Sequence, residues 1–553
     1  MIHATIGAPS AEPGPCSAQE TTQETTDERT PVGAPSRRSV VAGLAAAGFA
    51  AGLPVGAVAD DGASPRPFGP ETFEAMARDL VSRPFDGAFP PLPAALAQLD
   101  YDGWRDIRFR PDHALLGEAG GPFRLQLFHR GFLYPRPVDV SLVRDGVATP
   151  VRYDPALFNF GRTRIDGPLP ADLGFAGIRI HAPLNRPDRL DELIVFVGAS
   201  YFRFLGQDQL YGLSARGLAI GTDGAQEEFP LFRAFFIEVP PAGATTLTIH
   251  ALLDGPSTVG AYRFVVEPGR ETVLQVSATL YPRQTLSAVG IAPLTSMFFI
   301  NETDRGHSDD YRPELHDSDG LQLATGSGEW LWRPLDNPRE RRISTFLDRD
   351  PKGFGLMQRD RNFASYQDLE AGYERRPGYF VEPEGAWGEG SVVLVELPTD
   401  NETADNIVAF WRPKAPYPAG EPVRLGYRLR AHAAEALHPN GRVVNTFTAE
   451  AAASGAARRA PDQASLRSRR FLIDFGGGTL ETLGADPSPP EIVATASIGR
   501  ITATSIVPNP HIGGFRVALD VRVDGPGTTE LRAYLRKGDQ ALTETWSYPW
   551  SVA

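Results

Sequence analysis

The segment "PELHDSDGLQLATGSGEWLWRP", residues 313–334, gathers side chains that could do chemistry. It holds three carboxylates (Glu314, Asp317 and Asp319) and His316 within six residues, and two tryptophans follow. The sequence on either side has the alternating pattern that is typical of β-strands. A calcium loop, a carbohydrate site and an ordinary surface turn would each fit this composition, so the rest of the chain has to distinguish them.

The calcium interpretation fails on spacing. Asp317-x-Asp319-Gly320 resembles the opening of a calcium loop, in which alternate carboxylates turn inward and glycine permits the bend. The next alternate position is Leu321, and the twelfth position, which needs a glutamate, is Gly328. The histidines lack zinc-like spacing, and we find neither a glycine-rich phosphate loop nor a nucleophile elbow. We therefore expect no metal and no cofactor.

A carbohydrate site fits better. Sugar rings pack against aromatic side chains, and hydrolysis of a glycosidic bond needs two carboxyl groups. Residues 298–411 combine many acids with large aromatic residues, namely Trp330, Trp332, Tyr366, Tyr373, Tyr379, Trp387 and Trp411. Most such aromatics belong to a core in a protein of this kind, and composition alone does not select the two carboxylates.

The N-terminus predicts export. "SRRSVVAGLAAAGFAAGLPVGAVADDG" has a charged start at Arg37 and Arg38, a short apolar run, and a small-residue cleavage site that ends at Ala59. The twin arginine predicts the route that exports folded proteins, here to the periplasm of a Gram-negative bacterium, although a disordered cytosolic tail is the alternative. The only cysteine, Cys16, precedes the cleavage site, so the mature chain would form no disulfide. The net charge of −14 argues against nucleic acid as a partner.

The rest of the chain is predicted to be all-β. "PETFEAMARDLVSRPF" predicts one helix after the leader, and alternating or fully apolar runs then dominate, separated by many of the 56 glycines and 50 prolines. A second, short helix is expected in "ASYQDLEAGYERRP", because Tyr366, Leu369 and Tyr373 would share one face. We expect a large antiparallel β-sandwich followed by a smaller one.

The predicted domains follow changes in composition. They are a disordered region with the signal peptide at 1–59, a large β-sandwich at 60–411, a proline-rich linker at 412–421, and a smaller β-sandwich at 422–553. An arginine-rich stretch at 449–470, low in large apolar residues, is predicted to be a mobile insertion loop.

Long strings of the sequence resemble one family, the OpgG/OpgD periplasmic glucan biosynthesis proteins. The strings that carry the resemblance are "GASYFRFLGQDQLYGLSARGLAIGT", "EEFPLFRAF", "GIAPLTSMF", "RPELHDSDGL", "GEWLWRPLDNP", "DPKGFGLMQRDRNFASYQDLEAGYERRP" and "WGEGSVVLVELPTDNETADNIVAFWRP". Together they extend from about residue 66 to the C-terminus. The twin-arginine leader resembles the D-type and the glycine after "HDSD" the G-type, so the paralogue stays open.

The resemblance implies a fold and an activity. The fold would be a galactose-mutarotase-like β-sandwich with a long cleft, followed by an immunoglobulin-like β-sandwich. The activity would be that of an inverting endo-β-1,2-glucanase, or of a transglycosylase that gives cyclic products, within osmoregulated periplasmic glucan synthesis. Alternatives are a non-catalytic glucan-binding protein of the same pathway and a scaffold whose C-terminal sandwich docks the inner-membrane glucan synthase.

The resemblance also implies site residues. The string "ETADNI" would supply the general acid, Asp405, and "HDSD" the general base, Asp317, acting through water. Burial beside the apolar strand "IVAFW" would keep Asp405 protonated, whereas Asp317 lies in a polar turn and ionises more easily. The fold must bring together these two residues, which are 88 positions apart. Candidates for glucan binding are Tyr201, Arg203, Trp330, Tyr366, Asp368, Tyr373 and Trp387.

Overall fold

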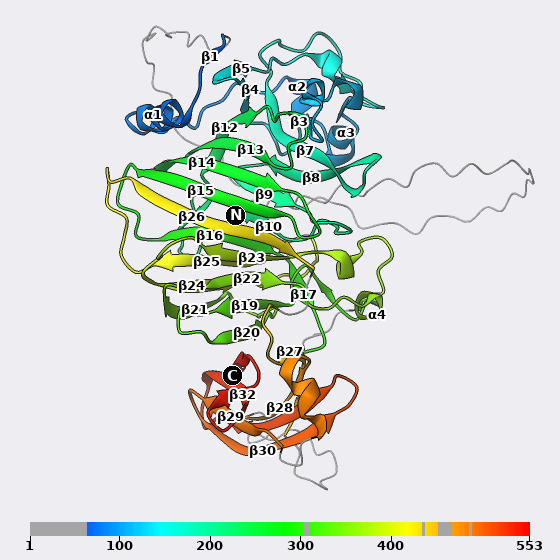
Figure 1. The fold of residues 1–553 in the computed structure, drawn as a ribbon, viewed down its shortest axis with the longest axis vertical. Coiled ribbons are helices and arrows are strands. Elements are labelled where there is room, and N and C mark those ends of the chain that lie inside the picture. The colour runs from blue at the N-terminus through cyan, green and yellow to red at the C-terminus, as the bar shows by residue number, and fades with distance from the viewer. Residues whose placement is uncertain (1–63, 304–308, 434–436, 452–466, 486–488, 553) are drawn as a thin grey trace, which may run out of the picture. The chain divides into compact units, whose positions relative to one another are not determined.

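The computed structural model describes residues 64–303, 309–433, 437–451, 467–485 and 489–552 (Figure 1). The expected signal peptide at 1–59, the twin arginine, Cys16 and the middle of the 449–470 stretch lie outside the described residues, so these features stay predictions.

Two large sheets dominate the described part of the chain (Figure 1). Fifteen strands of the sixteen-stranded sheet follow in the order β1 (Arg66–Pro67), β5 (Val147–Pro150), β4 (Asp139–Arg144), β12 (Leu231–Glu238), β13 (Leu247–Asp254), β14 (Thr258–Glu267), β15 (Val273–Pro282), β26 (Val423–His432), β23 (Gly378–Pro383), β22 (Gly353–Met357), β19 (Gly320–Ala324), β20 (Trp330–Pro334), β34 (Thr545–Val552), β32 (Gly527–Lys537) and β29 (Glu491–Ala496), and β33 (Gln540–Ala541) pairs with β32. The ten-stranded sheet contains, in order, β21 (Arg342–Arg349), β24 (Glu389–Glu396), β25 (Ile407–Pro413), β16 (Val289–Ser296), β10 (Ser214–Arg216), β9 (Tyr201–Phe204), β8 (Arg189–Val197), β7 (Phe175–Arg186) and β3 (Arg124–His129), with β11 (Leu218–Ile220) beside β16. The all-β prediction is confirmed.

Three smaller sheets complete the strands. They are the pair β17 (Phe298–Ile300) and β18 (Leu315–His316), the pair β2 (Arg108–Phe109) and β6 (Phe158–Asn159), and a four-stranded sheet in the order β27 (Arg442–Glu450), β28 (Ser468–Gly476), β31 (Gly514–Arg522) and β30 (Arg500–Asn509). Among the pairings described, β4 with β12 and β20 with β34 are parallel.

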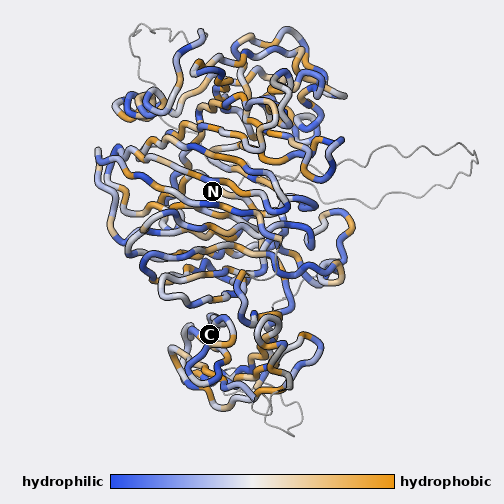
Figure 2. The backbone as a smooth tube through the Cα atoms, viewed as in Figure 1, coloured by the Kyte–Doolittle hydropathy of each residue, from blue (hydrophilic) through white to orange (hydrophobic). Residues whose placement is uncertain are grey.

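The main core lies between the two large sheets. Phe196 of β8 and Phe202 of β9, from the ten-stranded sheet, pack on Phe264 of β14 in the other sheet with ring centroids 5.2 and 5.3 Å apart. Figure 2 shows apolar stretches running along the strands of this region. Each large apolar side chain that is buried in this way stabilises the fold by ~1.5–3 kcal/mol. This packing fixes the position of the ten-stranded sheet against the sixteen-stranded sheet.

The described helices are short. They are α1 (Pro70–Val81), α2 (Ala94–Ala97), α3 (Tyr101–Arg105) and α4 (Phe363–Tyr366), with 3-10 turns η1 (Pro111–His113), η2 (Gly117–Ala119), η3 (Pro155–Leu157), η4 (Tyr373–Arg375) and η5 (Gly478–Ala485). α1 confirms the helix predicted after the leader: Pro70 opens it, and Phe73 and Ala77 are its buried residues. None of the described helices is both long and apolar enough to cross a membrane.

The second predicted helix is wrong in its extent. α4 ends at Tyr366, because the next residue, Gln367, has a left-handed φ of 57°. Leu369 is 90% exposed, although Tyr366 and Tyr373 are buried. The cause is Asp368, whose carboxylate accepts hydrogen bonds from the backbone N–H groups two and three residues further on. A local turn of this kind competes with helical hydrogen bonding.

The predicted domain boundary at 412–421 also needs correction. β26, expected to open the C-terminal sandwich, pairs with β15 and β23 in the large sheet. The four-stranded sheet starts only at β27, and its core side chains pack against β32 and β34. The proline-rich segment therefore connects the two large sheets, because β25 before it belongs to the ten-stranded sheet and β26 after it to the sixteen-stranded sheet.

Candidate active site

A cavity of about 910 Å³ lies against the ten-stranded sheet. Alternate residues of a strand point to opposite faces of its sheet. Phe202, Ala215 and Leu294 face the main core, whereas their neighbours Tyr201 and Arg216 line the cavity. The cavity therefore lies on the face of the sheet that points away from the core, where loops 221–229 and 284–288 also border it. Such a concave site could hold several sugar units.

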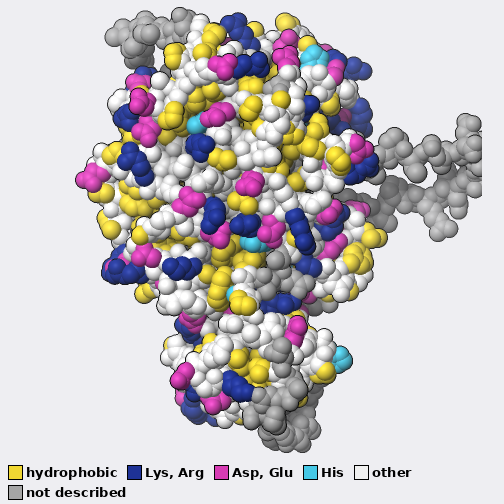
Figure 3. Space-filling model, viewed as in Figure 1, with side chains coloured by type: hydrophobic (Ala, Val, Ile, Leu, Met, Phe, Trp, Pro, Cys, Tyr) yellow, Lys and Arg dark blue, Asp and Glu magenta, His cyan; other side chains and the backbone are white. Residues whose placement is uncertain are grey.

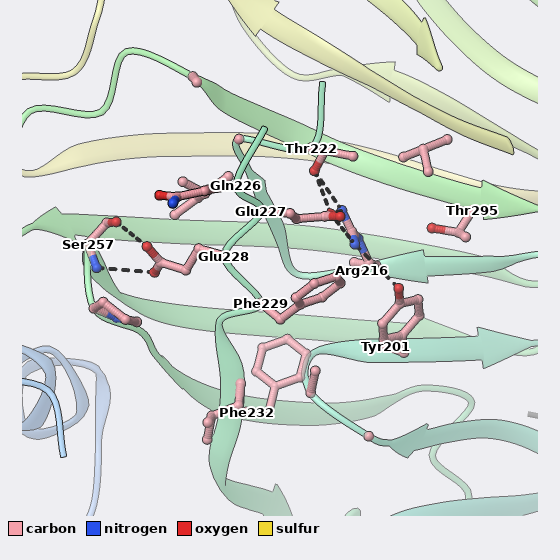
Figure 4. Close-up of a pocket in the computed structure, with 18 of the residues that line it drawn as sticks. Tyr201, Arg216, Thr222, Gln226, Glu227, Glu228, Phe229, Phe232, Ser257 and Thr295 are labelled. Carbon is pink, nitrogen blue, oxygen red and sulfur yellow. Dashed lines mark hydrogen bonds and ion pairs between the residues drawn. The ribbon is translucent and has the colours of Figure 1, made fainter. Parts of the chain in front are cut away.

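A buried arginine organises one wall of this cavity (Figure 4). Arg216 donates to the Glu227 carboxylate at 2.9 Å and to the Tyr201 hydroxyl at 3.3 Å. The Thr222 hydroxyl donates to the same carboxylate at 2.7 Å. The side chain of Arg216 is only 3% exposed, so this network fixes Tyr201 in a single orientation. The carboxylate of the next residue, Glu228, accepts a hydrogen bond from the backbone N–H of Ser257.

Asp405 also lines the cavity. It lies two residues before the buried β25, and its side chain is 18% exposed. The next residue, Asn406, anchors the position: its amide accepts from Phe298 N at 2.8 Å and donates to Phe298 O at 2.9 Å. Arg203 lies beside Asp405, with Nη2 3.9 Å from Oδ2.

Asp317 contacts Met297, the residue before Phe298. Its backbone N–H donates to Met297 O at 2.8 Å, and its carboxylate forms an ion pair with Arg376. Because Met297 precedes Phe298, the same segment binds the backbone of Asp317 and the side chain of Asn406, the residue after Asp405. The fold thus brings the two predicted catalytic residues to one segment.

Side chains connect the two regions as well. Arg376 lies over the ring of Tyr373, 3.9 Å from its centroid, and the Tyr373 hydroxyl donates to Glu402 at 3.1 Å. Glu402 is three residues before Asp405 in the sequence. A chain of contacts therefore runs from Asp317 through Arg376 and Tyr373 to the loop that carries Asp405.

Two more predicted residues belong to this connected cluster. Asp368 accepts from Arg312 at 2.8 Å, and Arg312 also pairs with Glu402 at 2.9 Å. Tyr366 is fully buried, stacks on Tyr373 with centroids 5.6 Å apart, and donates its hydroxyl to a backbone carbonyl. Their assignment to glucan binding stays a prediction.

The two remaining predicted residues lie elsewhere, outside the residues that line the cavity. Trp330 packs on Phe380 and His438 beside the C-terminal core. Trp387 packs on Trp411 and donates to the carbonyl of Gly426 at 3.3 Å. Their roles in substrate binding stay predictions.

Sequence reasoning did not single out Arg216, Glu227, Arg376 or Glu402. Each is a charged residue within a string that carries the family resemblance, so membership in these strings is the sequence feature that could have identified them. Composition could not select these charges from the many others, because their importance comes from contacts between distant segments.

The structure gives Asp319 and Gly320 roles other than a calcium loop. Asp319 Oδ2 accepts from the backbone N–H groups of Arg359 and Asp360 at 2.9 and 3.1 Å. A Cβ on Gly320 would lie 2.1 Å from the Trp332 ring. The glycine therefore permits close packing between β19 and β20.

Comparisons with known proteins agree on one family. The family described as "Periplasmic glucan biosynthesis protein, MdoG" matches residues 68–550. A protein of Bradyrhizobium diazoefficiens named "Glucans biosynthesis protein G" is 45% identical over 517 residues, which cover 93% of this chain and 100% of the relative. Proteins of the same name from Vibrio cholerae and from a Shewanella species are 45% and 46% identical, covering 88% and 86% of this chain and 87% and 86% of the relatives.

Proposed function

Because this chain belongs to the MdoG family of periplasmic glucan biosynthesis proteins, we propose that it acts on β-1,2-linked glucan in the cavity beside Asp405. The reaction is endo-hydrolysis with inversion at the anomeric carbon, or transglycosylation when a sugar hydroxyl replaces water. The observation that supports this best is Asp405 in the wall of a cavity of about 910 Å³, next to Asn406, whose side chain binds the segment that also binds the backbone of Asp317.

Asp405 is the general acid in this proposal. It protonates the glycosidic oxygen as the bond breaks, which avoids an alkoxide leaving group. A glucan chain in the cavity would displace water from around the carboxyl, and such desolvation favours the protonated form against the influence of Arg203. Arg203 and Tyr201 are in reach of the same substrate, since Tyr201 lines the cavity and Arg203 contacts Asp405.

Asp317 is the general base and acts through intervening water. Its ion pair with Arg376 holds the carboxylate in place for this role. It is 5% exposed and outside the residues that line the cavity, which agrees with a relay rather than with direct contact to the attacking water. A water molecule could pass its proton through this relay while it attacks the anomeric carbon.

The test is to incubate the purified mature protein with linear β-1,2-glucan and to analyse the products by mass spectrometry and NMR. Shorter glucans or cyclic products are expected, and the first hydrolysis products should have the inverted anomeric configuration. Retention of configuration would mean a covalent intermediate, and the roles given to the two carboxylates would then be wrong.

Substitutions separate the two roles. Asp405→Asn and Asp317→Asn should each lower turnover ~10²–10⁴-fold, while glucan binding persists because the lost interaction belongs to the transition state. A substrate whose leaving group needs no protonation should partly rescue Asp405→Asn alone. Asp400→Asn, an exposed carboxylate in the same loop, is the matched control and should keep full activity. Full activity of both catalytic variants would contradict this mechanism.

A non-catalytic glucan-binding protein of the same pathway is the alternative. The arginines beside both carboxylates support it, because an ionised pair could bind sugar hydroxyls without transferring protons. Tight glucan binding with no product from any linear β-1,2-glucan would favour this function. The inner-membrane glucan synthase is then a candidate partner, and co-purification from membranes would test that association.

A further inference from the structure

A separate buried cluster lies next to Asp317 in the sequence but outside the proposed catalytic groups. Glu314, His316 and Asp360 each offer one ligand atom, and these atoms lie within 4.8 Å of one another. His316 is fully buried, and the two acids are mostly buried. They come from two segments, the strand β18 with its preceding residue and the loop that follows β22.

The histidine is oriented as a metal ligand would be. Its Nδ1 is 2.8 Å from Gln358 Oε1, and the Gln358 amide nitrogen donates to the carbonyls of His316 and Tyr373. Since these carbonyls fix the orientation of the amide, Nδ1 must be the donor and Nε2 faces Glu314 Oε2 at 3.2 Å. A histidine ligand usually donates its other ring N–H to an oxygen in this way.

A second, independent observation points to a missing cation. Asp319 is 8% exposed, and its Oδ1 is buried without a hydrogen-bond partner in the described part of the chain. Its other oxygen, Oδ2, accepts from the backbone N–H of Asp360 at 3.1 Å, so this carboxylate lies against the cluster. An unpartnered buried carboxylate oxygen is costly, and a cation would satisfy it.

From this geometry we propose that Glu314, His316 and Asp360 bind a zinc ion, with Asp319 as a further carboxylate beside it. Zinc is coordinated by histidine nitrogen and carboxylate oxygen at ~2.0–2.2 Å, so that ligand atoms lie ~3.4 Å apart in a tetrahedral site. The ligand atoms need to approach one another only by small side-chain movements. The inference does not depend on the proposed enzymatic function.

The test is zinc binding by the metal-stripped mature protein, measured by calorimetry and by thermal unfolding. One zinc ion per chain should bind, and the melting temperature should rise with zinc concentration. Asp360→Asn and Glu314→Gln preserve side-chain size but remove a ligand charge, and should each weaken zinc binding at least ~100-fold. Asp112→Asn, at an exposed acid beside His113, is the control and should bind zinc like the wild type.

Absence of stoichiometric zinc binding by the wild type, or unchanged zinc affinity in both ligand variants, would overturn the proposal. Crystals of the wild-type protein soaked in zinc give a test that does not depend on the folding of any variant. The anomalous signal at the zinc edge should peak between the three ligand residues. A peak elsewhere would place the ion at another site and contradict the assignment.

Discussion

At the scale of single residues, Tyr373 shows how a predicted substrate platform can have a connecting role. It is 3% exposed, so little of its ring is available to a sugar, but its hydroxyl contacts Glu402 and its face contacts Arg376. Both partners adjoin the proposed catalytic carboxylates. The structure therefore suggests that Tyr373 positions Asp317 and the loop of Asp405.

Tyr373→Phe tests this positioning role. The variant loses one hydrogen bond, so its unfolding free energy should fall by only ~0.5–1.5 kcal/mol. If Tyr373 aligns the loop, glucan turnover should fall at least ~10-fold with little change in glucan affinity. Tyr262→Phe, whose hydroxyl donates to the carbonyl of Gly217, is the matched control and should keep normal turnover. Equal turnover in the two variants would contradict the positioning role.

At this scale, the sequence predicts which residue types could form the site better than it predicts which side chains contact one another. The resemblance assigns Asp317 and Asp405, and in the structure one segment binds the backbone of Asp317 and the side chain of Asn406 beside Asp405. Trp330 and Trp387 were chosen because they are large aromatics near acids, yet they pack on other aromatic side chains away from the cavity lining. A sequence cannot show which face of a strand a tryptophan occupies when both faces are buried.

At the scale of elements, Glu544 joins segments that are far apart in the chain. Its carboxylate accepts from Arg359 at 2.7 Å, from the backbone N–H of Val443 at 2.8 Å, and lies 3.0 Å from His438. Burial alone would raise the pKa of Glu544, but Arg359 and His438 lower it to about 2. This ionised group, directly before β34, binds β27 and the loop after β22.

Glu544→Gln should be strongly destabilising. The substitution leaves Arg359 buried without its counter-ion, and breaking a buried pair in this way costs ~3–5 kcal/mol. Urea unfolding monitored by tryptophan fluorescence measures the loss. Glu491→Gln, which removes an exposed ion pair with Arg536, should change stability by less than ~1 kcal/mol. A small effect in Glu544→Gln would mean that the network does not stabilise the fold.

Strands were the most predictable elements, and connections the least. β24 and β25 were predicted from nearly continuous apolar runs, and both are buried. The position of β26 was not predictable, because the alternating pattern of "VRLGYRLRAH" identifies a strand but not its neighbours. The helix after residue 363 was overestimated because the turn made by Asp368 competes with the helical pattern.

At the scale of the whole molecule, surface charge is mixed. Figure 3 shows acidic and basic side chains interspersed over the face that it draws. This distribution and the net charge of −14 suit a neutral polysaccharide better than a polyanion. Stability as a function of pH then depends mainly on buried groups.

His129 gives the stability a defined dependence on acid. Burial is the main reason that its pKa is lowered to about 4, compared with 6.5 for an exposed histidine. The unfolded chain therefore binds the extra proton, so this contribution is complete above pH 6.5 and is lost as the pH falls towards 4. Between pH 7.5 and 5, His129 should account for a loss of about 2 kcal/mol. His129→Gln should reduce that loss, as measured by urea unfolding at both pH values, and an unchanged loss would contradict the assignment.

Export is the other whole-molecule prediction. Arg37→Lys combined with Arg38→Lys should retain the precursor inside the cell, because the folded-protein export route recognises the twin arginine. Cell fractionation and immunoblotting measure the distribution. Normal periplasmic accumulation of the double variant would exclude this route.

The parallel pairing of β20 with β34 has a consequence for how the chain acquires its structure. More than two hundred residues separate the two strands, so the edge of β20 stays open until that whole intervening length has been synthesised. An open strand edge can pair with a strand of another chain, and pairings between distant segments form slowly. The nascent protein should therefore depend most on chaperones at the β19–β20 hairpin, which becomes native only when residues 545–552 arrive.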